Sequence, residues 1–186
     1  MSHTKRTILG ISGSTRIGSS NENVLKAISE KYKDRFDFIL YKQIDGLPHF
    51  NPDLDTEFPP QAVLDFRALV EKSDAVIICT PVYVFSLPGS LKNALEWTVS
   101  TVVFSDKPVG LIVGSGHGIQ TLESLQLIMK TIQAKIGERS ALILKGIRRD
   151  DPPGTISDME AVQRIDEMMK DIEEALMLPA EESNHR

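Results

Sequence analysis

Near its start the chain reads Gly10-Ile-Ser-Gly-Ser-Thr-Arg-Ile-Gly-Ser-Ser-Asn21, a stretch of small and hydroxyl-bearing residues with one arginine and no carboxylate. The apolar run at 8–11 leads into this loop and predicts a buried strand. After the loop, apolar residues recur at the spacing of a helix, at positions 24, 25, 28 and 32. A strand, a glycine- and serine-rich loop and a helix start therefore follow one another, as in an α/β fold.

This loop is suited to binding a phosphate group. The first turn of a helix leaves backbone N–H groups unpaired and carries the positive end of the helix dipole, so an anion there meets donors already aimed at it. Ser14 and Thr15 would add hydroxyl donors, and Arg16 would add charge-assisted hydrogen bonds. In the alternative interpretation, Ser19 and Glu22 form only a capping box, but a cap explains neither the three glycines nor the arginine.

Two common nucleotide-binding patterns are absent from the loop. It lacks G-x-x-x-x-G-K-[ST], the pattern of nucleoside-triphosphate sites of the Walker type. Its glycines stand at positions 10, 13 and 18, which does not fit the G-x-G-x-x-G fingerprint of dinucleotide sites. The pattern therefore favours a single terminal phosphate, as on a mononucleotide.

Composition narrows the class of protein. The 186 residues are enough for one α/β domain with a substantial core, and 21 basic against 26 acidic residues give a net charge of −5. No basic run is present, which argues against a nucleic-acid partner. The single cysteine, Cys79, ends the apolar run at 75–79 and is expected to be buried and structural. We expect no signal segment, no membrane association and a cytoplasmic location.

Apolar runs alternate with helical patterns along the chain. Strands are expected over residues 7–12, 36–41, 75–80, 109–114 and 141–145, with the mixed second strand at an edge. Helices are expected over residues 21–33, 61–72, 90–99, 118–136 and 157–177. Strict alternation of five strands and five helices predicts a doubly wound parallel sheet, whose ligands bind at the carboxyl ends of the strands. Residues 1–178 are expected to form one domain, followed by a polar tail over 179–186.

The segment Thr80-Pro-Val-Tyr-Val-Phe-Ser-Leu-Pro88 follows the third predicted strand. Its two prolines bracket an apolar and aromatic loop at the ligand end of the sheet, where it would cover the flat ring of a ligand. In the alternative interpretation, Tyr83 and Phe85 fill the core or an interface.

A third loop, Gly114-Ser-Gly-His-Gly118, stands between the fourth strand and a long helix. Its three glycines let the backbone approach a ligand closely, and successive N–H groups there attract negative charge. A tight turn that binds nothing is the alternative. Together the three loops fit flavin mononucleotide (FMN), with the phosphate at the first loop, the isoalloxazine ring at the second and its pyrimidine edge at the third.

Four motifs give the chain a family resemblance. They are Gly13-Ser-Thr-Arg16 with Ser20-Asn21, Leu47-Pro-His-Phe-Asn-Pro-Asp53, Pro81-x-Tyr83 and Pro88-Gly-x-Leu-Lys-Asn-Ala-x-Glu-Trp97. Over about residues 7–145 the chain resembles the NAD(P)H-dependent FMN reductases. The resemblance implies a flavodoxin-like sheet of order 2-1-3-4-5 with helices on both faces, and bound FMN. It also implies NADPH or NADH as electron donor, a small-molecule acceptor such as free flavin, a quinone, an azo compound or a metal oxyanion, and a homodimer or homotetramer.

The resemblance also assigns residues to the cofactor. The FMN-contacting positions are expected in the three loops, at Ser12, Ser14, Thr15, Arg16, Ser20, Asn21, Pro81, Val82, Tyr83, Val84, Phe85, Ser86, Gly114, Ser115, Gly116, His117 and Gly118. Family members often carry Glu and Asn where this chain has Val82 and Val84. We expect no metal ligands and no catalytic acid–base pair, because the cofactor carries the chemistry.

The expected reaction passes hydride from the nicotinamide to flavin N5, and electrons then reach an acceptor at the same site, which predicts ping-pong kinetics. The alternatives are a flavodoxin-type electron carrier and a flavin-binding redox sensor. Trp97 and the loop at 47–54 are the expected surface for self-association, because aromatic residues are favoured at interfaces.

Overall fold

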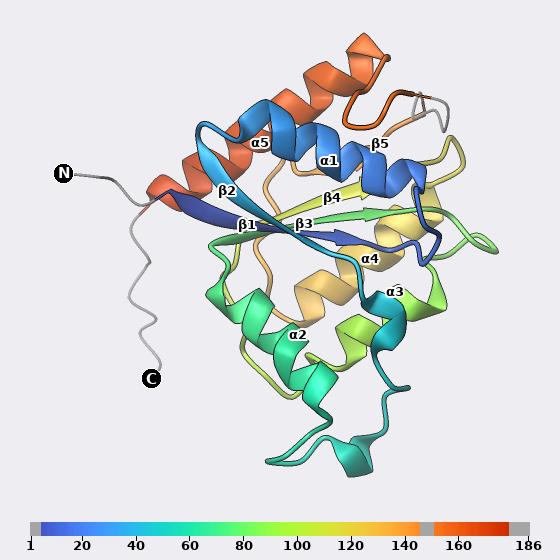
Figure 1. Cartoon of the computed structure of the whole chain (residues 1–186), viewed down its shortest axis with the longest axis vertical. Coiled ribbons are helices and arrows are strands. Elements are labelled where there is room, and N and C mark those ends of the chain that lie inside the picture. The colour runs from blue at the N-terminus through green and yellow to red at the C-terminus, as the bar shows by residue number, and fades with distance from the viewer. Residues whose placement is uncertain (1–4, 146–150, 179–186) are drawn as a thin grey trace.

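Five parallel strands form one sheet in the order β2-β1-β3-β4-β5, which confirms the expected order. In this computed structural model, which describes residues 5–145 and 151–178, the sheet runs through the centre of the molecule (Figure 1). The strands are β1 (Arg6–Ser12), β2 (Phe36–Tyr41), β3 (Ala75–Thr80), β4 (Val109–Val113) and β5 (Ala141–Ile143). All residues of β3 and β4 are buried, as expected for strands covered on both faces. The alternating, half-exposed β2 lies at the edge.

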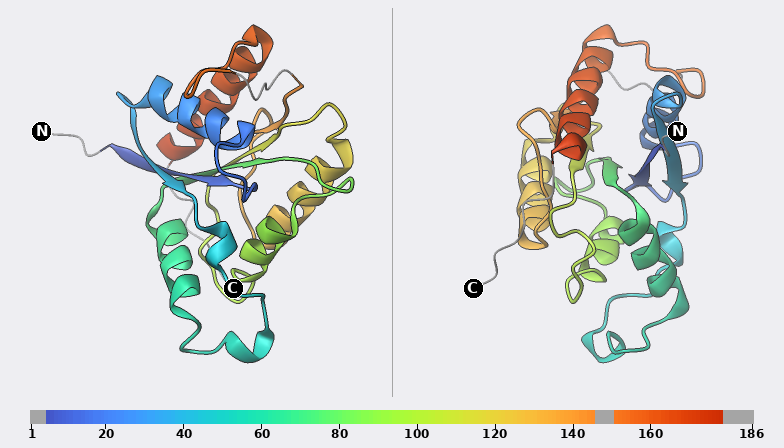
Figure 2. Two further views of the ribbon diagram at one scale, coloured as in Figure 1. Left: turned by 45° about the vertical axis from the view of Figure 1, so that its right-hand side comes forward. Right: turned by 90° about the vertical axis from the view of Figure 1, so that its left-hand side faces the viewer.

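Two layers of helices cover the sheet (Figures 1 and 2). On one face lie α1 (Ser20–Tyr32) and α5 (Met159–Met177), packed against inward residues of β1, β3 and β4. On the other face lie α2 (Gln61–Lys72), α3 (Gly89–Glu96) and α4 (Ile119–Thr131). Among the described residues, no helix combines the length and the hydrophobicity that crossing a bilayer requires.

The predicted end of α4 at residue 136 is wrong, because the helix ends at Thr131. Gln133 has a positive φ of 64°, a conformation that L-residues other than Asn and Asp seldom adopt and that an α-helix does not contain. The Ala134 N–H then donates to the Met129 carbonyl, and Lys135 pairs in parallel with Pro108. The apolar periodicity continues past the helix because Ile132 and Ile136 still pack against the core from this extended segment.

Trp97 is fully buried, so the prediction that it lies on a self-association surface is wrong. Its indole N–H donates to the Pro48 carbonyl at 2.7 Å, and its ring meets Phe50 edge-on with centroids 5.1 Å apart. Asn93 of α3 holds the same segment, since its side chain donates to the Pro48 carbonyl and accepts from the Phe50 N–H. Trp97 therefore belongs to the packing of the chain itself.

The stretch at 44–60 projects below the sheet in Figure 1 and contains two short 3₁₀ turns, η1 (Ile44–Gly46) and η2 (Pro52–Leu54). A nearly buried ion pair fastens its far end, because Arg67 of α2 donates to Asp55 at 2.7 Å and to the Trp97 carbonyl at 2.6 Å. Their side chains are only 12% and 7% exposed. Burial opposes ionisation of Asp55, but hydrogen bonds from Ser100 and Arg67 outweigh it and lower the pKa.

Replacing Trp97 by phenylalanine is expected to destabilise the fold by about 1 kcal/mol, because it removes the indole hydrogen bond while the Pro48 carbonyl keeps Asn93 as a donor. Urea unfolding of the two proteins measures the difference. Phe50→Leu serves as the control that removes the ring contact and leaves the hydrogen bond. Equal unfolding free energies for Trp97→Phe and the unchanged protein would contradict this role.

Candidate functional site

Three loops leave the carboxyl ends of β1, β3 and β4 and meet at one edge of the sheet, at the right of Figure 1. The strand register places Ser12 beside Cys79, and Thr80 beside Val113. Backbone hydrogen bonds continue the pairing into the loops, from the Gly13 N–H to the Cys79 carbonyl and from the Gly114 N–H to the Thr80 carbonyl. The three loops that carry the predicted site residues therefore begin side by side, as expected for the ligand end of a doubly wound sheet.

The first loop, residues 12–19, is folded by its own serines. The Ser12 hydroxyl accepts from the Ser14 N–H, and the Ser14 hydroxyl accepts from the Arg16 N–H. Ser12 and Ser14 are buried, whereas Thr15 and Arg16 are exposed. The Arg16 guanidinium makes no hydrogen bond or ion pair with any described residue, so it is free to fold over an anion.

The capping interpretation of Ser19 is correct in part. Its hydroxyl accepts from the Glu22 N–H at 3.1 Å, while the Glu22 carboxylate accepts from the Gly18 N–H at 3.2 Å. Lys26 and Lys42 also contact this carboxylate, and the Lys26 hydrogen bond, partly opposed by desolvation, is the main reason that the pKa of Glu22 is lowered. The two ammonium groups offset the negative charge next to the loop.

The geometry of this loop explains why two of its positions are glycine. A Cβ on Gly13 would lie 2.5 Å from the Thr80 hydroxyl and 2.8 Å from the Thr80 Cβ, so the loop lies against the end of β3 only without a side chain there. Gly18 has a φ of +64°, which favours glycine. Gly13 therefore allows close contact with β3, and Gly18 lets the backbone turn just before α1.

The second loop contains a tight two-residue hairpin turn. Tyr83 and Ser86 exchange backbone hydrogen bonds at 2.9 and 3.0 Å, and the central residues Val84 and Phe85 both have positive φ, 51° and 57°. The two side chains are 95% and 71% exposed, and Tyr83 is half-exposed. The alternative in which Tyr83 and Phe85 fill the core of the chain is therefore wrong.

The third loop leads into α4 without a side-chain cap, because Gly118 occupies the N-cap position. A Cβ on Gly118 would lie 2.6 Å from a Val113 methyl group, which explains the glycine. The Ser115 hydroxyl accepts from the His117 N–H, and His117 is exposed. In the first turn of α4, the Thr121 hydroxyl is buried and has no hydrogen-bond partner among the described residues. Since no side chain caps α4, the backbone N–H groups of its first turn are available at the end of the third loop.

Cys79 links β3 to the start of α1. Its thiol donates to the side-chain carbonyl of Asn21, with Sγ and Oδ1 3.4 Å apart, and both residues are buried. Complete burial raises the pKa of the thiol well above its usual range, so it stays protonated at physiological pH. The expectation of a buried cysteine is confirmed, but the sequence did not predict its contact with Asn21.

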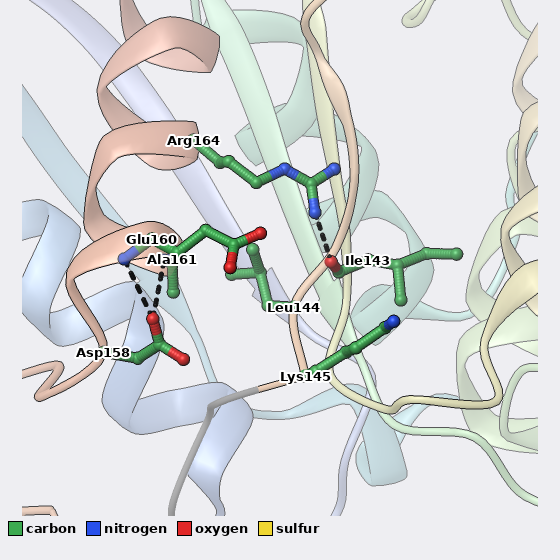
Figure 3. A pocket seen from close by; sticks show the side chains of 7 residues that line it. All are labelled: Ile143, Leu144, Lys145, Asp158, Glu160, Ala161 and Arg164. Carbon is green, nitrogen blue, oxygen red and sulfur yellow. Dashed lines mark hydrogen bonds between the residues drawn. The ribbon is translucent and has the colours of Figure 1, made fainter.

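A cavity beside this edge lies between the end of β5 and the first turn of α5 (Figure 3). Asp158 caps α5 by accepting from the backbone N–H groups of residues 160 and 161, and Arg164 donates to the Ile143 carbonyl at 2.6 Å. Lys145, which also lines the cavity, comes within 4.0 Å of a Cβ built on Gly116. None of the predicted site residues lines the cavity, whereas the three-loop site is open to solvent.

Comparisons with known proteins agree on one family. The family model described as NADPH-dependent FMN reductase matches residues 6–146. An NAD(P)H:quinone oxidoreductase of Solanum tuberosum is 30% identical over 168 residues, covering 85% of this chain and 86% of the relative. An NADH-dependent flavin reductase subunit 2 of Lactobacillus johnsonii is 29% identical, covering 86% and 91%. The solved FerB flavoenzyme, an NAD(P)H:(acceptor) oxidoreductase from Paracoccus denitrificans, has a TM-score of 0.77 and 26% identity, covering 91% of this chain and 98% of FerB.

Proposed function

This chain belongs to the NADPH-dependent FMN reductase family, a group of oxidoreductases with a flavodoxin-like fold, and from that membership we propose that it binds FMN across its three loops and reduces it with NADPH or NADH. The observation that carries the proposal is the convergence of the loops at the carboxyl ends of β1, β3 and β4. The chemistry supplied by bound FMN is hydride acceptance at N5 and onward electron transfer.

The residues present fit an FMN phosphate at the first loop. Arg16 is exposed and has no partner among the described residues, α1 begins directly behind the loop, and Gly13 leaves the backbone pressed against β3 with no side chain in between. An arginine and a helix N-terminus are both favourable partners for a phosphate. We assign the phosphate to residues 12–16 together with Ser20 and Asn21.

The other two loops would hold the ring. The exposed apolar turn at 83–86 offers a flat, weakly hydrated surface for one face or edge of the isoalloxazine, and Pro81 and Val82 extend it. The uncapped start of α4 after residues 114–118 offers N–H groups to the pyrimidine edge, where negative charge on the reduced flavin is stabilised.

We propose that the nicotinamide donor and the electron acceptor use the exposed face of the ring in turn, which gives ping-pong kinetics. An open site of this kind needs no separate dinucleotide-binding domain, in agreement with the missing fingerprint. The relatives from Solanum tuberosum and Lactobacillus johnsonii are named for quinone and flavin reduction, and we propose a small-molecule acceptor here, with free flavin, quinones, azo compounds and metal oxyanions as the classes to assay. We also propose a cytoplasmic homodimer or homotetramer.

Anaerobic absorbance spectroscopy tests the function directly. The protein is mixed with FMN, and one equivalent of NADPH, or separately of NADH, is added. We expect the flavin band to bleach at a catalytic rate, and the faster donor is the preferred one. Bound flavin that neither donor reduces would contradict the reductase proposal and favour an electron carrier or a redox sensor.

A further inference from the structure

Asn21 is the second residue of α1, and its side chain turns inward toward the sheet. The thiol of Cys79, at the next-to-last position of β3, donates to its Oδ1. The backbone carbonyl of the same cysteine accepts from the Gly13 N–H at 2.8 Å. One residue of β3 thus contacts both sides of the phosphate loop, its entry at Gly13 and its exit at Asn21.

The direction of the Cys79–Asn21 hydrogen bond determines which end of the amide is free. A buried thiol that stays protonated is a donor, so the oxygen of the amide faces it. The Nδ2 group then makes no hydrogen bond with any described residue. Among the described residues, Thr121 carries the one side-chain N or O atom that is fully enclosed and unpaired. Nδ2 of Asn21 therefore retains some exposure, although the residue as a whole is only 3% exposed.

We propose that Cys79 is a positioning residue for phosphate recognition: it holds the Asn21 amide with its N–H donors directed at the FMN phosphate. This inference rests on the proposed FMN binding. An amide that is free to rotate can turn its oxygen toward the phosphate, and a carbonyl oxygen repels an anion. The hydrogen bond from the thiol disfavours the orientation in which the amide oxygen faces the phosphate. The thiol is uncharged and does not compete with the amide for the phosphate.

The experiment compares the affinities of FMN and riboflavin, which differ only in the phosphate. Dissociation constants are measured by fluorescence titration for the unchanged protein, Cys79→Ala and Cys79→Ser. Cys79→Ala is expected to raise the Kd for FMN about fivefold, the effect of one hydrogen bond, and to leave the Kd for riboflavin unchanged. Cys79→Ser keeps a hydroxyl donor and is expected to restore most of the FMN affinity. If the alanine variant does not fold, Cys79→Val removes the donor in its place.

Two controls separate positioning from packing. Ile77→Val removes one buried methyl group from the same strand and the same face, and Ile77 makes no hydrogen bond to Asn21. It is expected to change the unfolding temperature slightly and neither affinity. In an Asn21→Ala background, Cys79→Ala is expected to cause no additional loss of FMN affinity, because the residue through which the thiol acts is gone.

Three results would overturn the inference alone: equal losses for FMN and riboflavin in Cys79→Ala, no loss for FMN, or a loss that persists in the Asn21→Ala background. An unchanged protein that binds neither flavin would refute the proposed function and this inference together.

Discussion

Replacing Arg16 by alanine is expected to weaken FMN binding by roughly 1.5–3 kcal/mol, or about 10- to 150-fold in Kd, the range for a hydrogen bond to a charged group. The guanidinium is exposed and has no partner among the described residues, so its removal disturbs no internal contact. The loss is therefore expected in ligand affinity and not in the free energy of unfolding. Fluorescence titration and urea unfolding of the same variant measure the two quantities.

Riboflavin is the matched ligand control, because a loss that arises at the phosphate leaves riboflavin affinity unchanged. Arg16→Lys is expected to fall between arginine and alanine, since an ammonium keeps the charge but not the planar pair of donors. Arg6→Ala removes a cation at the opposite end of β1, where Arg6 pairs with Asp74, and controls for net charge. Unchanged FMN affinity in Arg16→Ala would exclude the phosphate role of this loop.

The sequence predicted the layers of the fold because both faces of the sheet are buried. The strand at 75–80 and the helix at 61–72 were predicted with their exact bounds, since each is a clear apolar run or a clear helical repeat. The misplaced end of α4 and the wrong assignment of Trp97 share one cause. Periodicity and residue type report that a side chain is apolar or aromatic; they do not report whether the backbone that carries it is still helical, as at Ile132 and Ile136, or whether the core that it contacts belongs to the same chain, as at Trp97.

The sequence predicted which loops form the candidate site, but it did not predict the contacts between their side chains. The three loops follow strands that are neighbours in the sheet, so their proximity followed from the expected order. The Cys79–Asn21 hydrogen bond required more, because it depends on the face to which Cys79 points and on the height of α1 above that face. The exposure of Tyr83 and Phe85 could not be decided from the sequence either, since an apolar aromatic loop fits a core and a ligand platform equally well.

The turn at 83–86 is expected to be strained, and relieving the strain is expected to stabilise the protein. Both central positions have positive φ, where a β-branched residue such as Val84 is an outlier and Phe85 also carries a steric cost. Asn-Gly is the preferred pair for such a turn. The double variant Val84→Asn with Phe85→Gly is therefore expected to gain roughly 2–3 kcal/mol in the free energy of unfolding, measured in urea.

If the two exposed side chains cover the flavin ring, ligand binding accounts for the strained backbone of the turn. The stabilised variant should then bind FMN and riboflavin more weakly by the same factor, because both ligands contain the ring and only one contains the phosphate. Val84→Ala with Phe85→Ala is the matched control: it removes the same apolar surface, keeps most of the backbone strain, and should lose flavin affinity without gaining stability. Gained stability with undiminished affinity for both flavins would show that the turn does not contact the ring. A loss confined to FMN would place the turn at the phosphate, contrary to the arrangement of the three loops.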